Sequence, residues 1–380
     1  MKAALVLFDW FDHGGLQRDC RRIGESLVKK GADVSIICMH FDGDIPAGFS
    51  RISPALPAGS KVARRKAFAA FLAQHIKDVD YDVVCGFNRV PGLDYYFAAD
   101  TCFAWKANQE RNWFYRFSSR SRQYLAFEKE VFGQGSKTQV LMLSPMQKKE
   151  YLACYPHAKN RIHDIAPGIA RDRMAGDDAV ELRESLRSEF GIGGDDLLLL
   201  QIGTGYPIKG VDRSLKAIAA LPDSLKKRVH YLLLGEDRKG RYTAMAAKMS
   251  ISDRINIIGG RNDMPRFLQG ADIMLQPSRK ESAGMVILES IVAGLPVLTT
   301  ETCGYAFHVD ASQAGEVVKE PYTQQAMNSC LIGMLDQIGA DGGRRWKTNG
   351  IAYGEQGDFY DMPVQVADML LMHGDSSHAG

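Results

Sequence analysis

Residues 272–300, DIMLQPSRKESAGMVILESIVAGLPVLTT, begin and end with short apolar runs of strand length. Between the two runs, Met285, Leu288 and Val292 recur at the spacing of one apolar face of a helix. Gly294 follows this pattern directly, at a place where glycine commonly ends a helix. This order predicts two parallel strands joined by a crossover helix.

The same alternation occurs along almost the whole chain, and it restarts after the turn-rich, acidic residues 166–196. We therefore expect an α/β protein with two Rossmann-like, doubly wound parallel-sheet domains, 1–170 and 171–355, that face each other across a cleft. Residues 356–380 are expected to return toward the first domain as a helix and to end in a disordered tail after Met372. The expected strands are 3–8, 33–39, 82–87, 139–143, 197–203, 229–235, 255–258, 272–276 and 296–300, and the expected helices are 15–30, 61–77, 108–132, 210–221, 240–249, 263–270 and 284–293.

The composition excludes disordered and fibrous proteins, because 45% of the residues are hydrophobic and 24% are charged. No apolar run approaches the ~20 residues of a membrane-spanning helix. The N-terminal apolar run meets Asp9 too early for a signal peptide. The 7 cysteines are scattered, with no C-x-x-C pair, which indicates buried thiols in a reducing compartment. We expect a cytoplasmic protein, and the sequence does not indicate its oligomeric state.

Ligands of doubly wound sheets bind at the carboxyl ends of the strands, in the loops that lead into helices. Gly14 and Gly15 follow the first strand there, where the free N–H groups of a helix N-terminus bind phosphate. A plain turn that uses glycine for backbone freedom explains the pair equally well. The pattern is not G-x-G-x-x-G, so a nicotinamide or flavin site is poorly supported.

Lys209 lies in a glycine-rich loop, QIGTGYPIKGVDRS, after the first strand of the second domain. A lysine just ahead of a helix is locally unfavourable, because the N-terminal end of a helix carries a partial positive charge. A bound anion would resolve this conflict, so we favour a phosphate-binding role over a solvated surface lysine. The loop is not a P-loop, because the spacing and the Lys-Ser/Thr pair are missing.

Arg261 lies in the loop GGRNDMPRFLQGAD, after the third strand of the second domain. Asp263 is expected to be the N-cap of the following helix, with Pro265 in its first turn. The start of this helix explains why Asp263 and Pro265 occur here. It does not explain Arg261, which is either a ligand-binding residue or a surface residue.

Glu281 and Glu289 flank the start of the helix expected at 284–293. Glu281 precedes the helix in a loop that presents backbone N–H groups, and Glu289 projects from the helix itself. A surface helix with a polar first turn explains the two carboxylates as well as one shared site does.

These residues and motifs resemble the retaining family 4 glycosyltransferases with the two-domain GT-B fold. Glu281 and Glu289 have the spacing of the E-x7-E signature of that family, and Lys209-Gly210 stands where its members hold a sugar-nucleotide pyrophosphate. The closer resemblance is to lipopolysaccharide core glucosyltransferases that attach glucose α-1,3 to inner-core heptose, and it spans essentially the whole chain. It rests on GGLQRD (14–19), GFN (86–88), PGLD (91–94), YFAAD (96–100), APGIARDR (166–173), KGVDRS (209–214), GRND (260–263) and LPVLTTETCGYA (295–306).

The resemblance implies UDP-glucose as a substrate, no cofactor and no metal. Cations and helix dipoles would then meet the diphosphate charge. Many family members carry an arginine where this chain has Thr204. Arg173 is therefore the better candidate for a second cation that binds the diphosphate together with Lys209. The implied roles are diphosphate binding by Lys209, Arg173, Gly14 and Gly15; hexose binding by Glu281, Ala283, Gly284 and Met285; ribose binding by Glu289; and contacts around the uracil by Arg261.

Retention of configuration raises the question of a nucleophile, which in glycosidases is a carboxylate ~5 Å from a second one. The motif does not place a second carboxylate on the opposite face of the sugar, so we favour a front-face displacement in which the leaving diphosphate helps to deprotonate the acceptor. Glu281 is the catalytic candidate on the donor side. Asp100 and Asp19 are acceptor-side candidates, and a structural cap explains either of them equally well.

Residues 103–132 contain nine aromatic residues and six Lys or Arg against three Glu. A helix packed on the first domain explains several of these aromatics, but aromatic and arginine side chains together also suit an anionic membrane surface. We expect peripheral association with the inner face of the inner membrane. Nucleic acid is not an expected partner, because the net charge is only +2.

Two other enzymatic functions stay open at this stage. One is a family 4 transferase with another nucleotide-sugar donor or another glycolipid acceptor. The other is a non-hydrolysing UDP-sugar epimerase of similar shape, which needs no acceptor and no membrane-seeking segment. A non-catalytic nucleotide-sugar or membrane-binding module is less well supported, because Lys209, Glu281 and Glu289 occur together.

Overall fold

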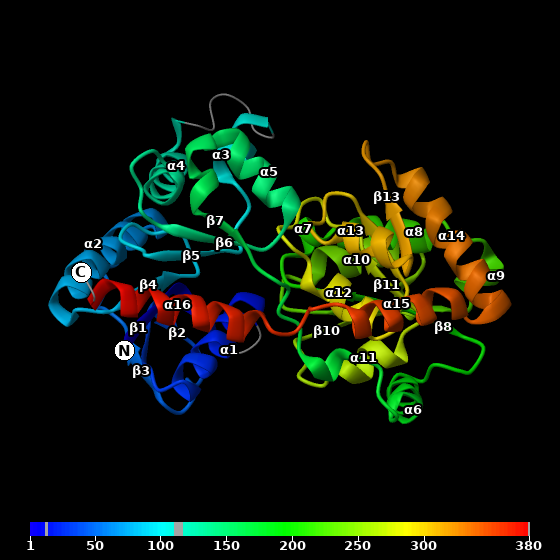
Figure 1. Cartoon of the computed structure of the whole chain (residues 1–380). Helices are drawn as coiled ribbons and strands as arrows, with labels where there is room; N and C mark the ends of the chain where they lie inside the picture. Colours follow the sequence, from blue (N-terminus) through cyan, green and yellow to red (C-terminus); the bar gives the residue numbers. More distant parts are fainter. Residues whose placement is uncertain (12–13, 110–116, 379–380) are drawn as a thin grey trace. The chain divides into compact units, whose positions relative to one another are not determined.

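Two compact α/β units make up the chain, a first unit of residues 1–168 with 360–380 and a second unit of residues 169–359 (Figure 1). Each is built on one parallel sheet with Rossmann-like crossovers, so the predicted fold class is confirmed. The expected boundaries, 170 and 355, lie within a few residues of these divisions, and the expected cleft stays a prediction. This computed structural model describes residues 1–11, 14–109 and 117–378.

The first unit contains a seven-stranded sheet of order β3-β2-β1-β4-β5-β6-β7. Its inner strand β1 is buried on both faces, with Ala3 to Leu7 at most 1% exposed, as expected for a parallel strand covered by helices on both sides. The strands are β1 (Lys2–Trp10), β2 (Asp33–Phe41), β3 (Phe49–Ile52), β4 (Val83–Gly86), β5 (Tyr95–Ala98), β6 (Gln139–Met142) and β7 (Ile162–Asp164). The helices are α1 (Gly15–Lys29), α2 (Lys61–Val79), α3 (Phe103–Gln109), α4 (Ser119–Phe132), α5 (Pro145–Cys154), η2 (Pro156–Arg161) and α16 (Met362–His378).

Serine caps decide where several helices of this unit begin. Ser60 and Ser144 accept hydrogen bonds from the first turns of α2 and α5. Ser118 does the same for α4, with an extended backbone at φ −64° and ψ 145°. The single helix expected over residues 108–132 is therefore wrong, because a new helix begins after Ser118. Residues 110–116 lie outside the described residues.

The C-terminal helix α16 is part of the first unit, where it packs on α1 and β4. Lys30 pairs with Asp368 at 2.7 Å, and the rings of His373 and Tyr95 meet edge to face at 5.3 Å. The expectation of disorder after Met372 is wrong for residues 373–378, because these contacts carry the helix on to His378.

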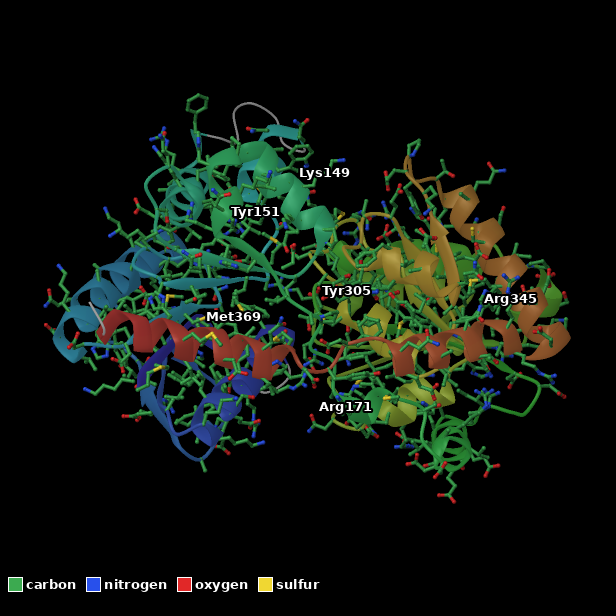
Figure 2. The ribbon with its side chains drawn as sticks, viewed as in Figure 1. Lys149, Tyr151, Arg171, Tyr305, Arg345 and Met369 are labelled. Carbon is green, nitrogen blue, oxygen red and sulfur yellow. The ribbon has the colours of Figure 1, made fainter. Side chains whose placement is uncertain are left out.

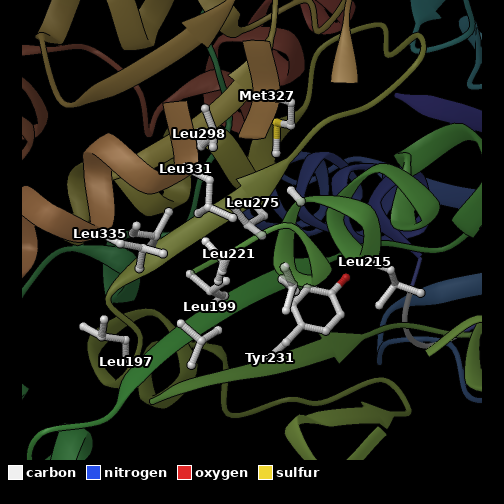
Figure 3. Packing of buried hydrophobic residues seen from close by; sticks show 14 of the residues in the cluster. Leu197, Leu199, Leu215, Leu221, Tyr231, Leu275, Leu298, Met327, Leu331 and Leu335 are labelled. Carbon is white, nitrogen blue, oxygen red and sulfur yellow. The ribbon is translucent and has the colours of Figure 1, made fainter. Parts of the chain in front are cut away.

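The second unit contains a six-stranded sheet of order β10-β9-β8-β11-β12-β13. Leucines of β8 pack with Leu215 of α8 and Leu331 of α14 in a dense core (Figure 3). The strands are β8 (Leu197–Ile202), β9 (Val229–Leu234), β10 (Ile255–Ile258), β11 (Ile273–Gln276), β12 (Val297–Thr300) and β13 (Gly315–Val318). The helices are η3 (Arg171–Arg173), α6 (Ala179–Glu189), α7 (Tyr206–Lys209), α8 (Val211–Ala219), α9 (Asp223–Lys226), α10 (Gly240–Lys248), η4 (Ser252–Arg254), α11 (Met264–Gly270), α12 (Met285–Val292), α13 (Ala306–Ser312), α14 (Gln324–Asp341) and α15 (Arg344–Gln356).

Candidate functional site

Three loops of the second unit meet at the carboxyl edge of its sheet, after the adjacent strands β8, β11 and β12. Because these strands are parallel and neighbouring, their following loops lie side by side. In the β11 loop, Arg279 donates its N–H to the Ile208 carbonyl of the β8 loop at 2.8 Å, and Glu281 donates its N–H to the Thr302 carbonyl of the β12 loop at 3.1 Å. The loops thus form one hydrogen-bonded surface.

Two glycines allow these loops to approach closely. Gly210 has φ +70°, and a Cβ there would lie 2.0 Å from the carbonyl oxygen of Pro277. Gly203 has φ +148°, and a Cβ there would lie 2.7 Å from Cε of Lys209. Both positions therefore require glycine, for backbone conformation as well as for space. The glycines let the Lys209 side chain lie across the end of β8.

Lys209 forms an ion pair with Glu281, at the point where the β8 and β11 loops meet. Both side chains are mostly buried, at 18% and 13% exposed. The other oxygen of the carboxylate accepts hydrogen bonds from Gln276 at 3.1 Å and Ser278 at 2.9 Å. The conflict of a lysine before a helix is thus resolved in this structure by a carboxylate of the same chain.

Burial alone would raise the pKa of the Glu281 carboxyl. The Lys209 charge and the hydrogen bonds from Lys209, Gln276 and Ser278 outweigh burial, and they hold the pKa below its usual value. Glu281 is therefore ionised at neutral pH. It accepts hydrogen bonds and stabilises positive charge, and it is not available there as a general acid.

The loop that carries Glu281 is fastened to the loop after β12. The Glu281 carbonyl accepts the N–H of Gly304 at 3.0 Å, and the Ala283 carbonyl accepts the N–H of Tyr305 at 2.7 Å. Tyr305, labelled in Figure 2, is 1% exposed. Because both sides of the loop are held by backbone bonds, the carboxylate has a fixed position at the edge of the sheet.

Helix α12 begins directly after Gly284, whose φ of +90° is one that residues with a side chain rarely adopt. Residues Val286 to Val292 are all buried, so the alternative of a surface helix is wrong. The first N–H groups of a helix have no partner within it, and they give this end a partial positive charge. Ala283 is buried and Met285 is half-buried at this N-terminus.

Glu289 lies on α12 and is 4% exposed. Its carboxylate lies 3.9 Å from Nε of Arg173, which is itself 8% exposed and comes from η3. Arg173 also pairs with Asp172 at 2.8 Å. Arg173 and Glu289, two of the predicted site residues, are therefore brought together in the second unit, although 116 positions separate them in the sequence.

Arg261 is held by a neighbouring carboxylate. It donates two hydrogen bonds to Asp263, at 2.9 and 2.8 Å, and lies 3.8 Å from Glu189. Asp263 occupies the N-cap position of α11, but its side chain makes no capping bond, so the expected cap is wrong in this respect. The hydrogen bonds from Arg261, the largest cause, lower the pKa of Asp263 to about 2.

In the first unit, Gly14 is the N-cap of α1 and Gly15 is its first residue. The φ of Gly14 is −90°, so the explanation by backbone freedom does not apply to it. Lack of space favours glycine at this position instead, because a Cβ there would lie 1.8 Å from the side-chain oxygen of Gln17. Gln17 donates in turn to the Asp9 carbonyl at 2.7 Å. Gln17 therefore joins the end of β1 to the first turn of α1.

The acceptor-side candidates are not helix caps. Asp19 lies in the second turn of α1, 6% exposed and 3.6 Å from Nε of Arg18. Asp100 follows β5, and its carboxylate lies 3.8 Å from the Arg89 guanidinium. The start of α3 is held instead by Glu128, which accepts the N–H groups of residues 103 and 104. A structural cap is thus excluded for both aspartates.

Sequence reasoning missed the residues that orient Glu281. Gln276 is the last residue of β11 and reads as part of an apolar run, while Ser278 reads as a turn residue. The one available signal is their place just after a buried strand, on the same loop as Glu281. Among the described residues, no group of three or more His, Cys, Asp or Glu side chains is placed to hold a metal ion.

Comparisons with known proteins cover both units of the chain. Residues 183–350 match the family model Glycosyl transferases group 1, and residues 13–173 match Glycosyltransferase Family 4. The lipopolysaccharide glucosyltransferase WaaG of Escherichia coli strain K12 is 37% identical over 370 residues, which cover 97% of this chain and 98% of that protein.

Solved structures extend the comparison. A crystal structure of WaaG, described as a glycosyltransferase involved in lipopolysaccharide biosynthesis, superposes with a TM-score of 0.93 and 37% identity over 97% of this chain and 99% of that chain. The Anabaena protein Alr3699/HepE, crystallised with UDP-glucose, superposes with a TM-score of 0.75 over 99% of this chain and 100% of that chain. At 15% identity, the second likeness shows a shared fold alone.

Proposed function

Because the chain belongs to the glycosyltransferase family of the lipopolysaccharide glucosyltransferase WaaG, we propose that it transfers glucose from UDP-glucose to an inner-core heptose of lipopolysaccharide. The product is an α-1,3 linkage, and the configuration at the anomeric carbon is retained. The observation that carries the proposal is the buried Lys209–Glu281 pair beside the N-terminus of α12.

The site supplies positive charge for a diphosphate without a metal. Lys209 and the N-terminal N–H groups of α12 lie at the same edge of the sheet, and charge-assisted hydrogen bonds from such groups are the strong ones. When the diphosphate binds, it shares the ammonium group of Lys209 with Glu281. Arg173 adds a buried guanidinium next to Glu289 on the same helix. These groups form the donor site of the proposed enzyme.

We favour a front-face displacement over a double displacement, because the motif places no carboxylate on the opposite face of the sugar to act as a nucleophile. The acceptor hydroxyl attacks the anomeric carbon on the face from which UDP leaves, and its proton goes to an oxygen of the departing β-phosphate. Positive charge develops on the sugar ring in such a reaction. A fixed carboxylate that binds hexose hydroxyls stabilises this charge, as Glu281 would do.

The proposed reaction is tested by incubating the protein with radiolabelled nucleotide sugars, one at a time, and lipopolysaccharide that ends in inner-core heptose. We expect the label to enter the lipopolysaccharide from UDP-glucose and from no other donor. Transfer from a different donor would leave a family 4 transferase of another specificity. Conversion of a UDP-sugar into its epimer without any acceptor would identify the epimerase instead.

We expect Glu289→Gln to weaken UDP binding about tenfold, because the amide accepts hydrogen bonds from the ribose less strongly than a carboxylate does. Calorimetry with UDP and with its 2′,3′-dideoxy analogue measures the contribution of the ribose. The wild-type protein should bind the analogue more weakly than UDP, and the variant should discriminate less between the two ligands. Equal discrimination by the two proteins would remove Glu289 from the ribose site.

We also propose that the protein associates peripherally with the cytoplasmic face of an anionic membrane through residues 103–132. Part of this segment, 110–116, lies outside the described residues. In the part that is described, Phe117 is 52% exposed, and Arg120 and Arg122 are exposed on α4. An exposed aromatic beside arginines suits an interface of anionic headgroups. The structure describes no helix long and apolar enough to cross a membrane.

For the variant Arg120→Gln/Arg122→Gln, we expect binding to vesicles with anionic lipid to fall by about thirtyfold, since each of the two arginines contributes about 1 kcal/mol near such a surface. Vesicle co-sedimentation at low and high salt measures the change. The matched control is Lys226→Gln/Lys227→Gln in the second unit, which should bind like the wild type. Unchanged binding by the α4 variant would refute the membrane role of this helix.

A further inference from the structure

The two oxygens of the Glu281 carboxylate have partners of different kinds. Lys209 holds Oε1 with a positive charge, and 18% of the lysine side chain is exposed. Gln276 and Ser278 hold Oε2 with neutral donors, an amide N–H at 3.1 Å and a hydroxyl at 2.9 Å. Both of these residues are 0% exposed. A ligand can therefore reach the charged partner of Glu281, but it cannot reach the two neutral partners.

Hydrogen bonds to the backbone fix the two neutral donors at the end of β11. Ser278 donates its N–H to the Gln276 carbonyl at 2.9 Å, and the same carbonyl accepts the Thr299 hydroxyl at 2.9 Å. The Ser278 carbonyl accepts the hydroxyls of Thr300 and Thr302, both at 2.6 Å. The protein itself therefore sets the positions of Gln276 and Ser278 relative to the carboxylate.

The side-chain amide of Gln276 is oriented by Glu281. Its nitrogen donates to the carboxylate, while its oxygen is buried and accepts no hydrogen bond from the residues that the structure describes. A buried acceptor without a partner is unfavourable. The opposite orientation would be worse, because it would place this oxygen against the negative charge of Glu281. The hydrogen bond to an ionised Glu281 therefore offsets the unpaired oxygen.

Binding of a diphosphate removes part of the charge that keeps Glu281 ionised. The diphosphate shares the ammonium group of Lys209 with the carboxylate, and it brings negative charges of its own. Both effects act together with burial to raise the pKa of Glu281. The hydrogen bonds from Gln276 and Ser278 lower this pKa, and they stay in place because no ligand reaches them.

Other ionisable groups near Glu281 do not take over this role. The Cys303 thiol lies 4.0 Å from Oε2 and is neutral, because burial raises its pKa. Arg213 of α8 donates to the Ser278 carbonyl at 3.4 Å, and Arg279 pairs with Asp212 at 2.8 Å. Among the described residues, Lys209 is the one cation that pairs with Glu281.

We propose that Gln276 and Ser278 are positioning residues that keep Glu281 ionised while the diphosphate of the donor shares Lys209. The carboxylate can then bind the hexose and stabilise positive charge on its ring when its own cation is partly withdrawn. The inference rests on the proposed function and deepens it, because it explains how one lysine can serve the diphosphate while Glu281 keeps its charge.

Calorimetry in buffers of different ionisation enthalpy tests this proposal, because the dependence of the heat on the buffer gives the number of protons taken up on binding. The ligand is UDP-glucose without an acceptor, whose diphosphate does not titrate near neutral pH. At about pH 7, the wild type should bind it without taking up protons. Gln276→Met/Ser278→Ala keeps most of the volume but lacks both donors, so it should take up about one proton per UDP-glucose, from the buffer to the Glu281 carboxyl.

The matched control is Ser290→Ala on α12. Ser290 is 0% exposed, and its hydroxyl donates to the Val286 carbonyl at 2.7 Å and not to Glu281. This variant should bind UDP-glucose without proton uptake, as the wild type does. Ser278→Ala alone removes one donor and little volume, so it keeps the test decisive if the double variant does not fold. It should take up about half a proton.

The rate of transfer gives a second readout that a purely structural role would not change. Release of UDP is measured with saturating UDP-glucose and heptose-terminated lipopolysaccharide. The kcat of the double variant relative to that of the wild type should rise about tenfold from about pH 6.5 to about pH 8.5, because Glu281 regains its charge as the pH increases. A relative kcat that is the same at every pH would reduce Gln276 and Ser278 to structural supports.

The calorimetric titration needs no turnover, so this proposal and the proposed function fail separately. If both the double variant and Ser278→Ala bind UDP-glucose without proton uptake, the role proposed for Gln276 and Ser278 is wrong, whatever the rate of transfer. If the double variant takes up a proton but the wild type transfers no glucose, the proposed function is wrong and the role of the two donors stands.

Discussion

Glu281→Gln is expected to lose glucosyl transfer by about a hundredfold or more in kcat and to bind UDP at least as tightly as the wild type. The amide keeps the shape of the side chain but removes the negative charge that faces the sugar, and one such electrostatic contact is worth about 10²–10³ in rate. The carboxylate also competes with a diphosphate for Lys209, so its removal frees the ammonium group for UDP. Release of UDP gives the rate, and calorimetry gives the affinity.

Glu316→Gln is the matched control, because Glu316 is an exposed carboxylate on β13 of the same sheet. It should leave rate and affinity unchanged. A parallel loss of UDP affinity in Glu281→Gln would mean that the carboxylate supports the nucleotide rather than the hexose. An unchanged kcat would reduce Glu281 to a structural partner of Lys209.

The positions of the site loops could be predicted from the sequence, because they follow from the order of strands and helices. Lys209, Glu281 and Glu289 were each expected next to a strand end or on a following helix, and the structure places them there. Their partners could not be predicted. That Lys209 meets Glu281 depends on β8 and β11 being neighbours in the sheet, and strand order is a property of the whole fold.

The errors in the prediction have a common physical origin, which is competition between the structural preference of a residue and the partners that the folded chain brings within its reach. Asp263 has the residue type of an N-cap, but its carboxylate accepts hydrogen bonds from Arg261 and Arg266 and not from the first N–H groups of the helix. Residues 373–378 read as a polar tail, yet the helix continues through them from a segment packed on α1. Local propensity indicates whether a residue suits a helix, a strand or a cap. Which hydrogen bonds its side chain makes depends on the groups that the fold brings close to it.

The buried Lys209–Glu281 pair balances its own charges within the protein. An unpaired ammonium or carboxylate at this depth would be costly, so each side chain stabilises the other before any donor binds. The pair also keeps both side chains in place, which lowers the entropy lost when the substrate arrives. Removal of either partner therefore affects folding as well as binding, and the two effects are separable by pH.

Lys209→Met is expected to weaken UDP binding by about tenfold to 150-fold, from the loss of a charge-assisted contact of about 1.5–3 kcal/mol. UDP-glucose should lose affinity by the same factor, because the contact is to the diphosphate. Calorimetry with both ligands measures this, and Lys216→Met on α8 is the control. An unchanged UDP affinity would place Lys209 outside the donor site.

The same variant should reverse the local pH dependence of stability. In the wild type, the pKa of Glu281 lies below its usual value of 4.5, so the pair stabilises the fold above about pH 4.5, and this contribution is lost as the pH falls through the lowered pKa. Without Lys209, burial becomes the dominant influence and raises the pKa of Glu281. The variant should then lose about 3 kcal/mol of stability at pH 7 and regain part of it at pH 5, where the carboxyl takes up a proton.

The double variant Lys209→Met/Glu281→Gln has no charge to bury, so its Tm at pH 7 should exceed that of Lys209→Met. Because removing both partners cannot restore the contacts to the donor, the double variant should recover stability and remain inactive. A double variant no more stable than Lys209→Met at pH 7 would show that the carboxylate is solvated once the lysine is gone, and that the pair contributes through packing alone.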